Sequence, residues 1–299
     1  MSTSMREQMG LTVGELFERD ERLALLLAEI STPYFQKLLR AYPERALNLG
    51  ILEQTLVGVA AGMALEGFIP VLHSIAPFLV ERPFEQIKDD FCYQGLQGNF
   101  ISIGASYDYS TEGMTHHGTG DVQILRSLPG MQIVVPGSAS EFDRLFRQAY
   151  ANGFPTYYRL SAHSNPVEYP IQFGRLEVLK QGSRATIIAV GPALARVLPT
   201  VEQLDVTLLY CTTVAPFDAE TLRATCQASD IIVVEPYYEG VLVPDICAAL
   251  KHMPIRVEAI GVPHKVLSHY GTSEQQDEAI GFTEQGIRRR IEEFLQAVP

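Results

Sequence analysis

The sequence lacks the short motifs by which several common enzyme classes are recognised. It has no GxxxxGK(S/T) loop and no GxGxxG that opens a helix after a strand, and both of these loops cradle phosphate groups with backbone amides. It also has no GxSxG turn, which presents the nucleophile of many serine hydrolases. These absences argue against phosphate-binding loops of these two kinds and against serine-hydrolase chemistry.

Metal ligands at a useful spacing are also missing from the sequence. His116 and His117 are adjacent, so their side chains diverge on either a helix or a strand. No second His, Cys or paired carboxylate stands at ligand spacing. The four cysteines form no CxxC pair and lie in apolar stretches, which indicates buried free thiols in a reducing compartment. We therefore expect no metal site built from this chain alone.

Charge and hydropathy exclude two further classes. The 23 Lys and Arg against 35 Asp and Glu give a net charge of −12, whereas nucleic-acid surfaces need clustered basic residues. The N-terminus, MSTSMREQMG, lacks the apolar core of a signal peptide. Even the largely apolar residues 47–72 are interrupted by Glu53, Gln54 and Glu66, so they do not predict a membrane span. We expect a cytoplasmic protein that binds neither nucleic acid nor membrane.

What the sequence does contain is a nearly continuous alternation of strand-like and helix-like segments. This order is typical of α/β folds with parallel sheets, and 299 residues suit two domains of about 150 each. In the first half we predict strands at 68–75, 100–105, 131–136 and 156–160, and helices at 12–30, 48–66, 78–94 and 140–150.

Residues 161–183 break this rhythm with two prolines and two glycines, which indicates an ordered linker. A second set of strands follows it, at 185–191, 205–211, 231–236 and 255–261. We therefore predict two doubly wound α/β domains with mainly parallel sheets. The predicted boundaries are 1–165 for the first domain, 166–183 for the linker and 184–299 for the second domain.

One carboxylate stands in an otherwise small and apolar segment, NLGILEQTLVGVAAG, at residues 48–62. Glu53 follows Gly50 by three positions, and two interpretations fit it. It could be a charge in the first turn of a helix, where the dipole favours an anion. It could instead be a buried carboxylate placed to exchange a specific proton. The segment alone favours the first interpretation.

The polar loop SYDYSTEGMTHHGTGD, residues 106–121, follows a predicted strand and carries two Tyr, two His and three carboxylates. Open α/β sheets bind ligands at the carboxyl ends of their parallel strands. Adjacent histidines bounded by glycines favour a ligand-binding loop over a solvated surface loop.

Three stretches in order resemble one family. LGILEQTLVGVAAGMALEG is similar to the glutamate helix of the transketolase-like, thiamine-diphosphate-dependent enzymes. EGMTHHGTGDVQILRSLPGMQIVVPGSASE is similar to their D-G-P-T-H loop and the strand after it. TVAPFDAE followed by IIVVEPYYEG resembles their C-terminal domain. The resemblance covers nearly the whole chain and implies transfer of a two-carbon ketol or acyl unit to a carbonyl acceptor.

The family's G-D-G…N motif, which binds diphosphate and Mg²⁺, is absent, and residues 1–10 leave no room for the domain that carries it. The resemblance therefore implies the C-terminal half of a split transketolase, with a pyrimidine-binding domain and a C-terminal domain. Thiamine diphosphate and Mg²⁺ would then bind with the help of an N-terminal partner subunit, in a heterotetramer.

The resemblance gives Glu53 a chemical role. It implies that the carboxyl hydrogen-bonds the aminopyrimidine ring of the cofactor, whose exocyclic nitrogen then removes the thiazolium proton. A carboxyl must be neutral to donate such a bond. Its apolar neighbours Ile51, Leu52, Leu56 and Val57 are expected to raise the pKa of Glu53 by desolvation.

The resemblance also implies roles for three other residues. Phe78 matches the aromatic that stacks on the pyrimidine ring, and Ile75 matches a second ring contact. His116 matches the histidine that faces the substrate and the reacting carbon. Arg82 matches a family arginine to which we assign no role here.

Departures from the family pattern fall on the substrate side. Glu112 and Met114 replace the usual Asp and Pro of the loop, and Ala162 and His163 follow YYRLS where transketolases carry an arginine for a sugar phosphate. Arg159 is expected to turn outward or to lie in the domain interface. We therefore predict an unphosphorylated or differently charged acceptor, or a cation supplied by the partner subunit.

Two other functions remain alternatives. The beta-type subunit of a 2-oxoacid dehydrogenase shares the architecture but usually carries T-E-A-G where this chain has LEQT. A non-catalytic regulatory subunit is the other, and the joint presence of Glu53, Phe78 and His116 argues against it. Enzymes that make deoxyxylulose phosphate share the T-H-(Q/H)-G loop but normally as one long chain.

Overall fold

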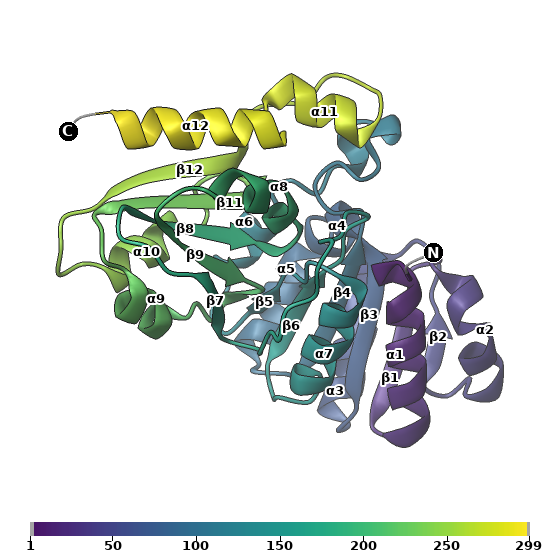
Figure 1. Cartoon of the computed structure of the whole chain (residues 1–299). Coiled ribbons are helices and arrows are strands. Elements are labelled where there is room, and N and C mark those ends of the chain that lie inside the picture. The colour runs from purple at the N-terminus through teal and green to yellow at the C-terminus, as the bar shows by residue number, and fades with distance from the viewer. Residues whose placement is uncertain (1–2, 298–299) are drawn as a thin grey trace.

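The computed structural model describes residues 3–297, which form two α/β units side by side (Figure 1). The first unit is a seven-stranded sheet in the order β10-β5-β6-β4-β3-β1-β2, in which β10 alone runs antiparallel to its neighbour. Its strands are β1 (Leu23–Leu27), β2 (Ala46–Asn48), β3 (Ile69–Ile75), β4 (Gly98–Ile103), β5 (Gln132–Val134), β6 (Pro155–Arg159) and β10 (Thr213–Ala215).

Helices cover both faces of this sheet because its strands are apolar on both sides. In β1, Leu23, Leu25 and Leu27 pack toward α1 and α7, while Ala24 and Leu26 pack toward α3. The helical segments are α1 (Met5–Arg19), α2 (Thr32–Ala41), α3 (Glu53–Leu65), α4 (Ala76–Val80), α5 (Phe84–Gln86), η1 (Ile87–Tyr93), η2 (Ser110–Glu112), η3 (Met114–His116), α6 (Asp121–Leu125) and α7 (Ala139–Ala149).

The second unit is a five-stranded sheet in the order β12-β11-β8-β9-β7. Its strands are β7 (Leu176–Lys180), β8 (Ala185–Val190), β9 (Val206–Cys211), β11 (Asp230–Tyr238) and β12 (Arg256–Val262). Its helical segments are η4 (Gly191–Ala193), α8 (Leu194–Val201), α9 (Ala219–Thr225), α10 (Val243–Ala249), α11 (Ser273–Ile280) and α12 (Glu284–Gln296). The prediction of two doubly wound domains with mainly parallel sheets is confirmed.

The expected helix at 12–30 is wrong. The helix begins earlier, at Met5, where the Ser4 side chain caps it by accepting from the amide of Glu7. It ends at Arg19, and Leu23–Leu27 forms β1 instead, because a short apolar run is equally compatible with a strand buried on both faces.

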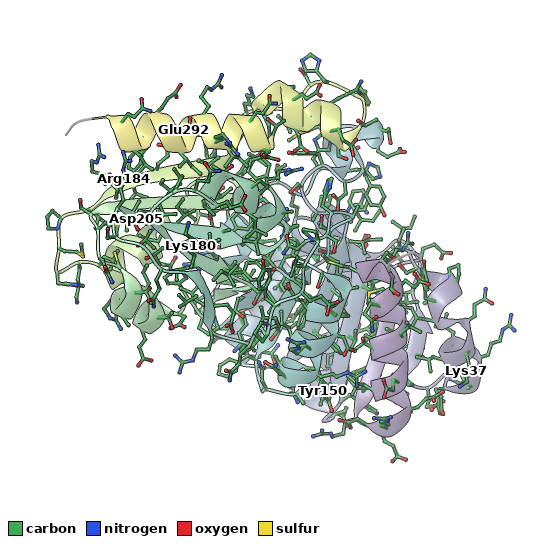
Figure 2. All side chains as sticks on the ribbon, in the orientation of Figure 1. Lys37, Tyr150, Lys180, Arg184, Asp205 and Glu292 are labelled. Carbon is green, nitrogen blue, oxygen red and sulfur yellow. The ribbon has the colours of Figure 1, made fainter. Side chains whose placement is uncertain are left out.

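Two other expectations fail locally. The helix expected at 78–94 is divided into α4, α5 and the π-helix η1, with Pro83 at the break before α5. Part of the expected linker 166–183 is the strand β7, which pairs antiparallel with β9 at the edge of the second sheet. Lys180 at its end donates to three carbonyls at the end of α8, those of Val201, Glu202 and Leu204 (Figure 2).

One strand of the first sheet comes from the second half of the chain. After β9 the chain crosses back, and β10 pairs with β5 of the first sheet through Thr213 and Val134. Within residues 3–297, none of the helices has the length and apolar character needed to cross a bilayer.

Candidate active site

Glu53 is the first residue of α3 and is only 2% exposed. Its Oε1 accepts a hydrogen bond of 3.0 Å from the Ser74 hydroxyl at the end of β3. Its Oε2 accepts one of 3.0 Å from Nη1 of Arg82. Of the four apolar neighbours expected to surround the carboxyl, Leu56 and Val57 are fully buried, whereas Ile51 and Leu52 are exposed, so the expectation is wrong for these last two. The burial comes from β3, which lies next to the start of α3.

Arg82 links Glu53 to Phe78. Its guanidinium lies 3.9 Å from the centroid of the Phe78 ring while it donates to the carboxylate. Phe78 belongs to α4, which begins directly after Ile75, the last residue of β3, and both side chains are half-buried. The guanidinium is planar and delocalised, so this place already accommodates a flat nitrogen-containing group between a ring face and a carboxylate.

His116 lies on the other side of Phe78. Their ring centroids are 5.0 Å apart in an edge-on arrangement, and the His116 ring is partly exposed. Its Nδ1 lies 3.0 Å from the Thr115 hydroxyl. His117 points away, is buried near Tyr107, and has a pKa lowered by that burial, so it is neutral at pH 7. Glu53, Phe78 and His116 thus form one site, and the two histidine rings diverge as predicted.

A cavity of about 220 Å³ opens beside this site at the carboxyl ends of β4 and β6. Its wall contains one cationic side chain among the described residues, Arg6, together with Asp108 and the loop residue Tyr109. The remaining lining residues are Ser4, Ile103, Gly104, Leu160, Ser161 and Ala162. The cavity therefore offers a mainly apolar space with a cation and a carboxylate on its wall.

A buried chain of hydrogen bonds holds Arg6. Nδ1 of His73 lies 2.7 Å from the carbonyl of Ile101, which only accepts, so Nδ1 carries the proton. Nε2 of His73 then accepts from the Ser31 hydroxyl at 2.7 Å, and the Ser31 oxygen accepts from Nε of Arg6 at 2.9 Å. Burial lowers the pKa of His73 to about 4, so this orientation persists at neutral pH.

Arg159 is buried and does not face the cavity. Its Nε donates to Asp121 at 2.8 Å and its Nη2 donates to the carbonyl of Gly118 at 2.9 Å. Its guanidinium lies 5.5 Å from the ring of Tyr237 in the second unit. Of the two positions predicted for Arg159, the structure shows the domain interface.

Several residues of the site were not identified from the sequence. Ser74 and His73 were assigned to a buried strand, and the pair of polar residues near its end was the available signal. Arg6 lies before the helix that we expected to begin at Thr12. No three His, Cys, Asp or Glu side chains in residues 3–297 are grouped as metal ligands.

Comparison with known proteins agrees with this architecture. Residues 1–166 match the family model of the transketolase pyrimidine-binding domain, and residues 174–287 match that of the transketolase C-terminal domain. An uncharacterized 33.6 kDa protein in the fasciation locus of Rhodococcoides fascians is 36% identical over 297 residues, covering 98% of this chain and 95% of that protein.

One of the subunits of the apulose-4-phosphate transketolase of Actinobacillus succinogenes is 30% identical over 217 residues, covering 69% of this chain and 70% of that relative. The chain spans about half the length of the 1-deoxy-D-xylulose-5-phosphate synthases that it also matches.

A solved structure described as a split gene transketolase, inactive beta4 tetramer, superimposes with a TM-score of 0.86 at 27% identity, covering 99% of both chains. Both matched domains and this full-length likeness agree with the resemblance seen in the sequence. The chain belongs to the transketolase family, in which it corresponds to the C-terminal half of a split enzyme.

Proposed function

We propose that this chain is the C-terminal subunit of a two-component, thiamine-diphosphate-dependent transketolase-like enzyme. It transfers a two-carbon ketol or acyl unit to a carbonyl acceptor and is active only with a partner subunit. The observation that carries this proposal is the convergence of Glu53, Phe78 and His116 on one site from three separate segments. Both matched domain models are transketolase models, which favours this function over a 2-oxoacid dehydrogenase component.

The site fits the aminopyrimidine of thiamine diphosphate. Arg82 already places a planar group over Phe78 with a hydrogen bond to Glu53, which are the two contacts that a flat nitrogen heterocycle needs. Ile75 caps the helix that carries Phe78, and we assign it to a second contact with the ring. When bound, the cofactor supplies a carbon nucleophile and an electron sink for the transferred unit.

Glu53 is placed to hydrogen-bond the ring nitrogen of that heterocycle. Its Oε1 accepts from the Ser74 hydroxyl and its Oε2 accepts from Arg82. A neutral ring in the place of the Arg82 guanidinium would meet Oε2, while the bond from Ser74 keeps the buried carboxyl in position. We assign Glu53 to this contact with the aminopyrimidine.

His116 acts on the substrate side. Its ring edge faces Phe78, and its partial exposure leaves it accessible from solvent. Imidazole groups exchange protons readily near neutral pH, which suits the hydroxyl or carbonyl oxygen of a sugar. We assign His116 to proton transfer with the donor or acceptor.

The cavity beside His116 is our proposed acceptor site. Arg6, a cation that the sequence did not predict for this site, lies in its wall and is held there by its contact with Ser31. A fixed guanidinium pairs with anionic groups, whereas Asp108 repels them. We propose an acceptor whose anionic or strongly polar end meets Arg6 while its hydroxyls face Asp108. The relative from Actinobacillus succinogenes is named for a sugar phosphate, which is consistent with such an acceptor.

A partner subunit would complete the site with the residues that bind diphosphate and Mg²⁺. An apolar face suited to docking lies beside Glu53, where Ile51, Leu52 and Leu65 are exposed together with Gly58 and Gly62. We propose a heterotetramer of two copies of each chain. The cytoplasmic location expected from the sequence stays a prediction.

Calorimetry of thiamine diphosphate binding, with and without the partner, tests the proposed function. We expect the chain alone to bind weakly in the presence of Mg²⁺ and to show no turnover, and the mixture to bind tightly and turn over. Tight Mg²⁺-dependent binding and activity by the isolated chain would contradict the split-enzyme proposal.

A further inference from the structure

The loop that carries His116 is held by the second unit of the chain as well as by its own domain, where Arg159 donates to the carbonyl of Gly118. We define residues 106–119, between β4 and α6, as the His116 loop. We propose that the C-terminal domain positions His116, with Tyr107 and Asp277 as the positioning residues. This inference rests on the proposed function, in which His116 reaches the substrate.

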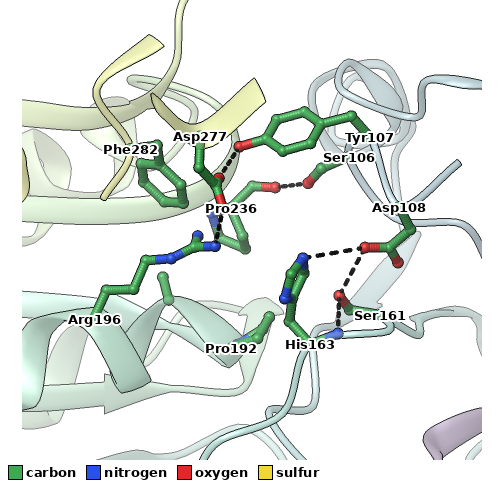
Figure 3. A pocket seen from close by; sticks show the side chains of 11 residues that line it. Ser106, Tyr107, Asp108, Ser161, His163, Pro192, Arg196, Pro236, Asp277 and Phe282 are labelled. Atoms are coloured by element: carbon green, nitrogen blue, oxygen red, sulfur yellow. Dashed lines mark hydrogen bonds and ion pairs between the residues drawn. The ribbon is translucent and has the colours of Figure 1, made fainter. Parts of the chain in front are cut away.

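A buried cluster of hydrogen-bonded side chains joins the loop to helices α8 and α11 (Figure 3). The hydroxyl of Tyr107 donates to Oδ1 of Asp277 at 2.5 Å, and Nη2 of Arg196 donates to Oδ2 of the same carboxylate. Tyr107 and Asp277 are 3% and 5% exposed. Burial raises the pKa of the Tyr107 phenol, so the phenol stays protonated and keeps donating. Asp277 is thus fixed by two donors from two different domains.

Two further hydrogen bonds lie on either side of this cluster along the loop. The Ser106 hydroxyl donates to the carbonyl of Pro236, and the amide of Tyr238 donates to the carbonyl of Thr119 at 3.0 Å. These two bonds attach the beginning and the end of the His116 loop to β11.

The middle of the loop is attached to the segment before α11. The Ser110 hydroxyl donates to the carbonyl of Gly271 at 2.5 Å. The ring of Tyr270 lies against Gly113 so closely that a Cβ there would come within 2.6 Å of it. Gly113 has a φ of +76°, so a side chain at this position would be strained as well. The C-terminal domain therefore contacts the loop at its start, middle and end.

By contrast, the His116 ring has few contacts of its own. It meets Phe78 edge-on at 5.0 Å and Tyr109, another loop residue, at 6.5 Å, and its Nδ1 lies 3.0 Å from the hydroxyl of Thr115. Tyr109 and Thr115 belong to the loop themselves, so the position of the ring depends on that of the loop backbone. A displacement of about 1 Å of a catalytic group can cost about a hundredfold in rate. Loosening the cluster is therefore expected to lower kcat without removing His116.

Three variants test the inference. Tyr107→Phe removes only the hydroxyl. Asp277→Ala removes the carboxylate that accepts from Tyr107 of the first domain and from Arg196 of the second. Asp230→Ala is the matched control, because Asp230 pairs with Arg256 at the opposite end of β11 and touches no loop residue. In the chain alone, we expect faster amide hydrogen exchange at residues 109–118 in the first two variants and wild-type exchange there in the control.

The assembled enzyme gives the second measurement. We expect Tyr107→Phe to lower kcat about tenfold or more, with the dissociation constant of thiamine diphosphate unchanged. In a His116→Ala background the same change is expected to have almost no further effect on kcat, because the two residues act through one group.

Two results would overturn the inference. One is wild-type exchange at residues 109–118 in both Tyr107→Phe and Asp277→Ala, whatever their melting temperatures. The other is an equal loss of kcat from Tyr107→Phe with and without His116. A wild-type chain that shows no turnover with any partner would instead count against the proposed function, since the exchange measurement needs no activity.

Discussion

At the scale of single residues, a substitution of Glu53 distinguishes its two interpretations, a charge at a helix terminus and a carboxylate that exchanges a specific proton. Glu53→Gln keeps the shape of the side chain and its contact with Ser74, so we expect the fold and most cofactor affinity to remain. Turnover is expected to fall about a thousandfold or more, since general acid–base groups contribute at this level. Stopped-flow turnover of the assembled enzyme is the measurement. If Glu53 were only a helix-terminus charge, the change would cost about 0.3–1 kcal/mol of stability and leave turnover intact.

Arg82 occupies the place that we assign to the aminopyrimidine. Its side chain is 41% exposed, and it is paired with Glu53 and stacked on Phe78. We expect Arg82→Ala to strengthen binding of thiamine diphosphate to the assembled enzyme a few-fold, because no ion pair must be broken first. Isothermal titration calorimetry measures this change. Weaker binding in the variant would show that Arg82 holds the cofactor instead of preceding it.

Arg6 is expected to determine whether the acceptor cavity prefers an anionic acceptor. Removing one charge-assisted hydrogen bond costs about 1.5–3 kcal/mol, so Arg6→Ala is expected to lower kcat/KM for an anionic acceptor by about ten- to a hundredfold. The loss is expected to be much smaller for the dephosphorylated form of the same sugar. Arg40, a surface cation on α2, provides a matched control in Arg40→Ala. Equal losses for both acceptors would remove Arg6 from substrate recognition.

At the scale of helices and strands, α3 presents its glycines outward. A Cβ built at Gly62 meets nothing within 4 Å, so Gly62→Glu is compatible with the folded monomer. We expect this change to prevent assembly with the partner, because a charged side chain would then cover the apolar face beside Glu53. Gly14 on α1 is an equally open helical glycine, so Gly14→Glu serves as the control. Sedimentation analysis of each variant with the partner decides, and normal assembly of Gly62→Glu would exclude this face.

At this scale, some strands could be predicted from the sequence and others could not. Strands such as β3, β8 and β9 were predicted because each is a dense apolar run bounded by turn residues. The run Leu23–Leu27 was assigned to a helix because periodicity cannot distinguish a short buried strand from a helix segment. β7 was missed since only its first residue is buried and its pattern is weak.

The candidate site residues likewise divide into those that the sequence predicted and those that it did not. Glu53, Phe78 and His116 were found because each stands in a recognisable motif, and the structure places them together. Arg6, Ser31 and His73 were missed because their link exists only in space: the serine is 25 residues from the arginine and 42 from the histidine. Tyr107 and Asp277 are 170 residues apart, so no local pattern could pair them.

At the scale of the whole molecule, the site depends on both units of the chain. β10 joins the first sheet after the second has begun, Arg159 lies beside Tyr237, and the His116 loop is attached to β11 and α11. Among residues 3–297, the hydrogen bonds of Glu53 and the ring contacts of Phe78 come from the first unit, whereas the loop that carries His116 is held by both units. Loss of this domain is therefore expected to impair turnover even though the pyrimidine-binding residues all belong to the first unit.

Stability of the whole chain is expected to depend on pH through Glu235. This carboxyl is fully buried in β11 and accepts from the amides of Gly240 and Leu242 at 2.7 and 2.9 Å. Burial raises its pKa to about 7 from 4.5. Between these values the folded chain holds a proton that the unfolded chain has lost, so stability falls as the pH rises through this range. The total loss is about 3 kcal/mol.

Glu235→Gln removes this titration while keeping an acceptor oxygen for one of the two amides, and the loss of the other bond does not depend on pH. We therefore expect the urea midpoint of the wild-type chain to fall, relative to that of the variant, as the pH rises from about 4.5 to about 7, and the difference to level off above it. Asp230→Asn, at the start of the same strand, is the control, since the pKa of Asp230 is lowered by its bond to Arg256. Its titration ends below this range, so the control should follow the wild-type profile there. A wild-type midpoint that stays level or rises relative to Glu235→Gln over the same range would show that Glu235 stays charged in the folded chain, held by its two amide donors.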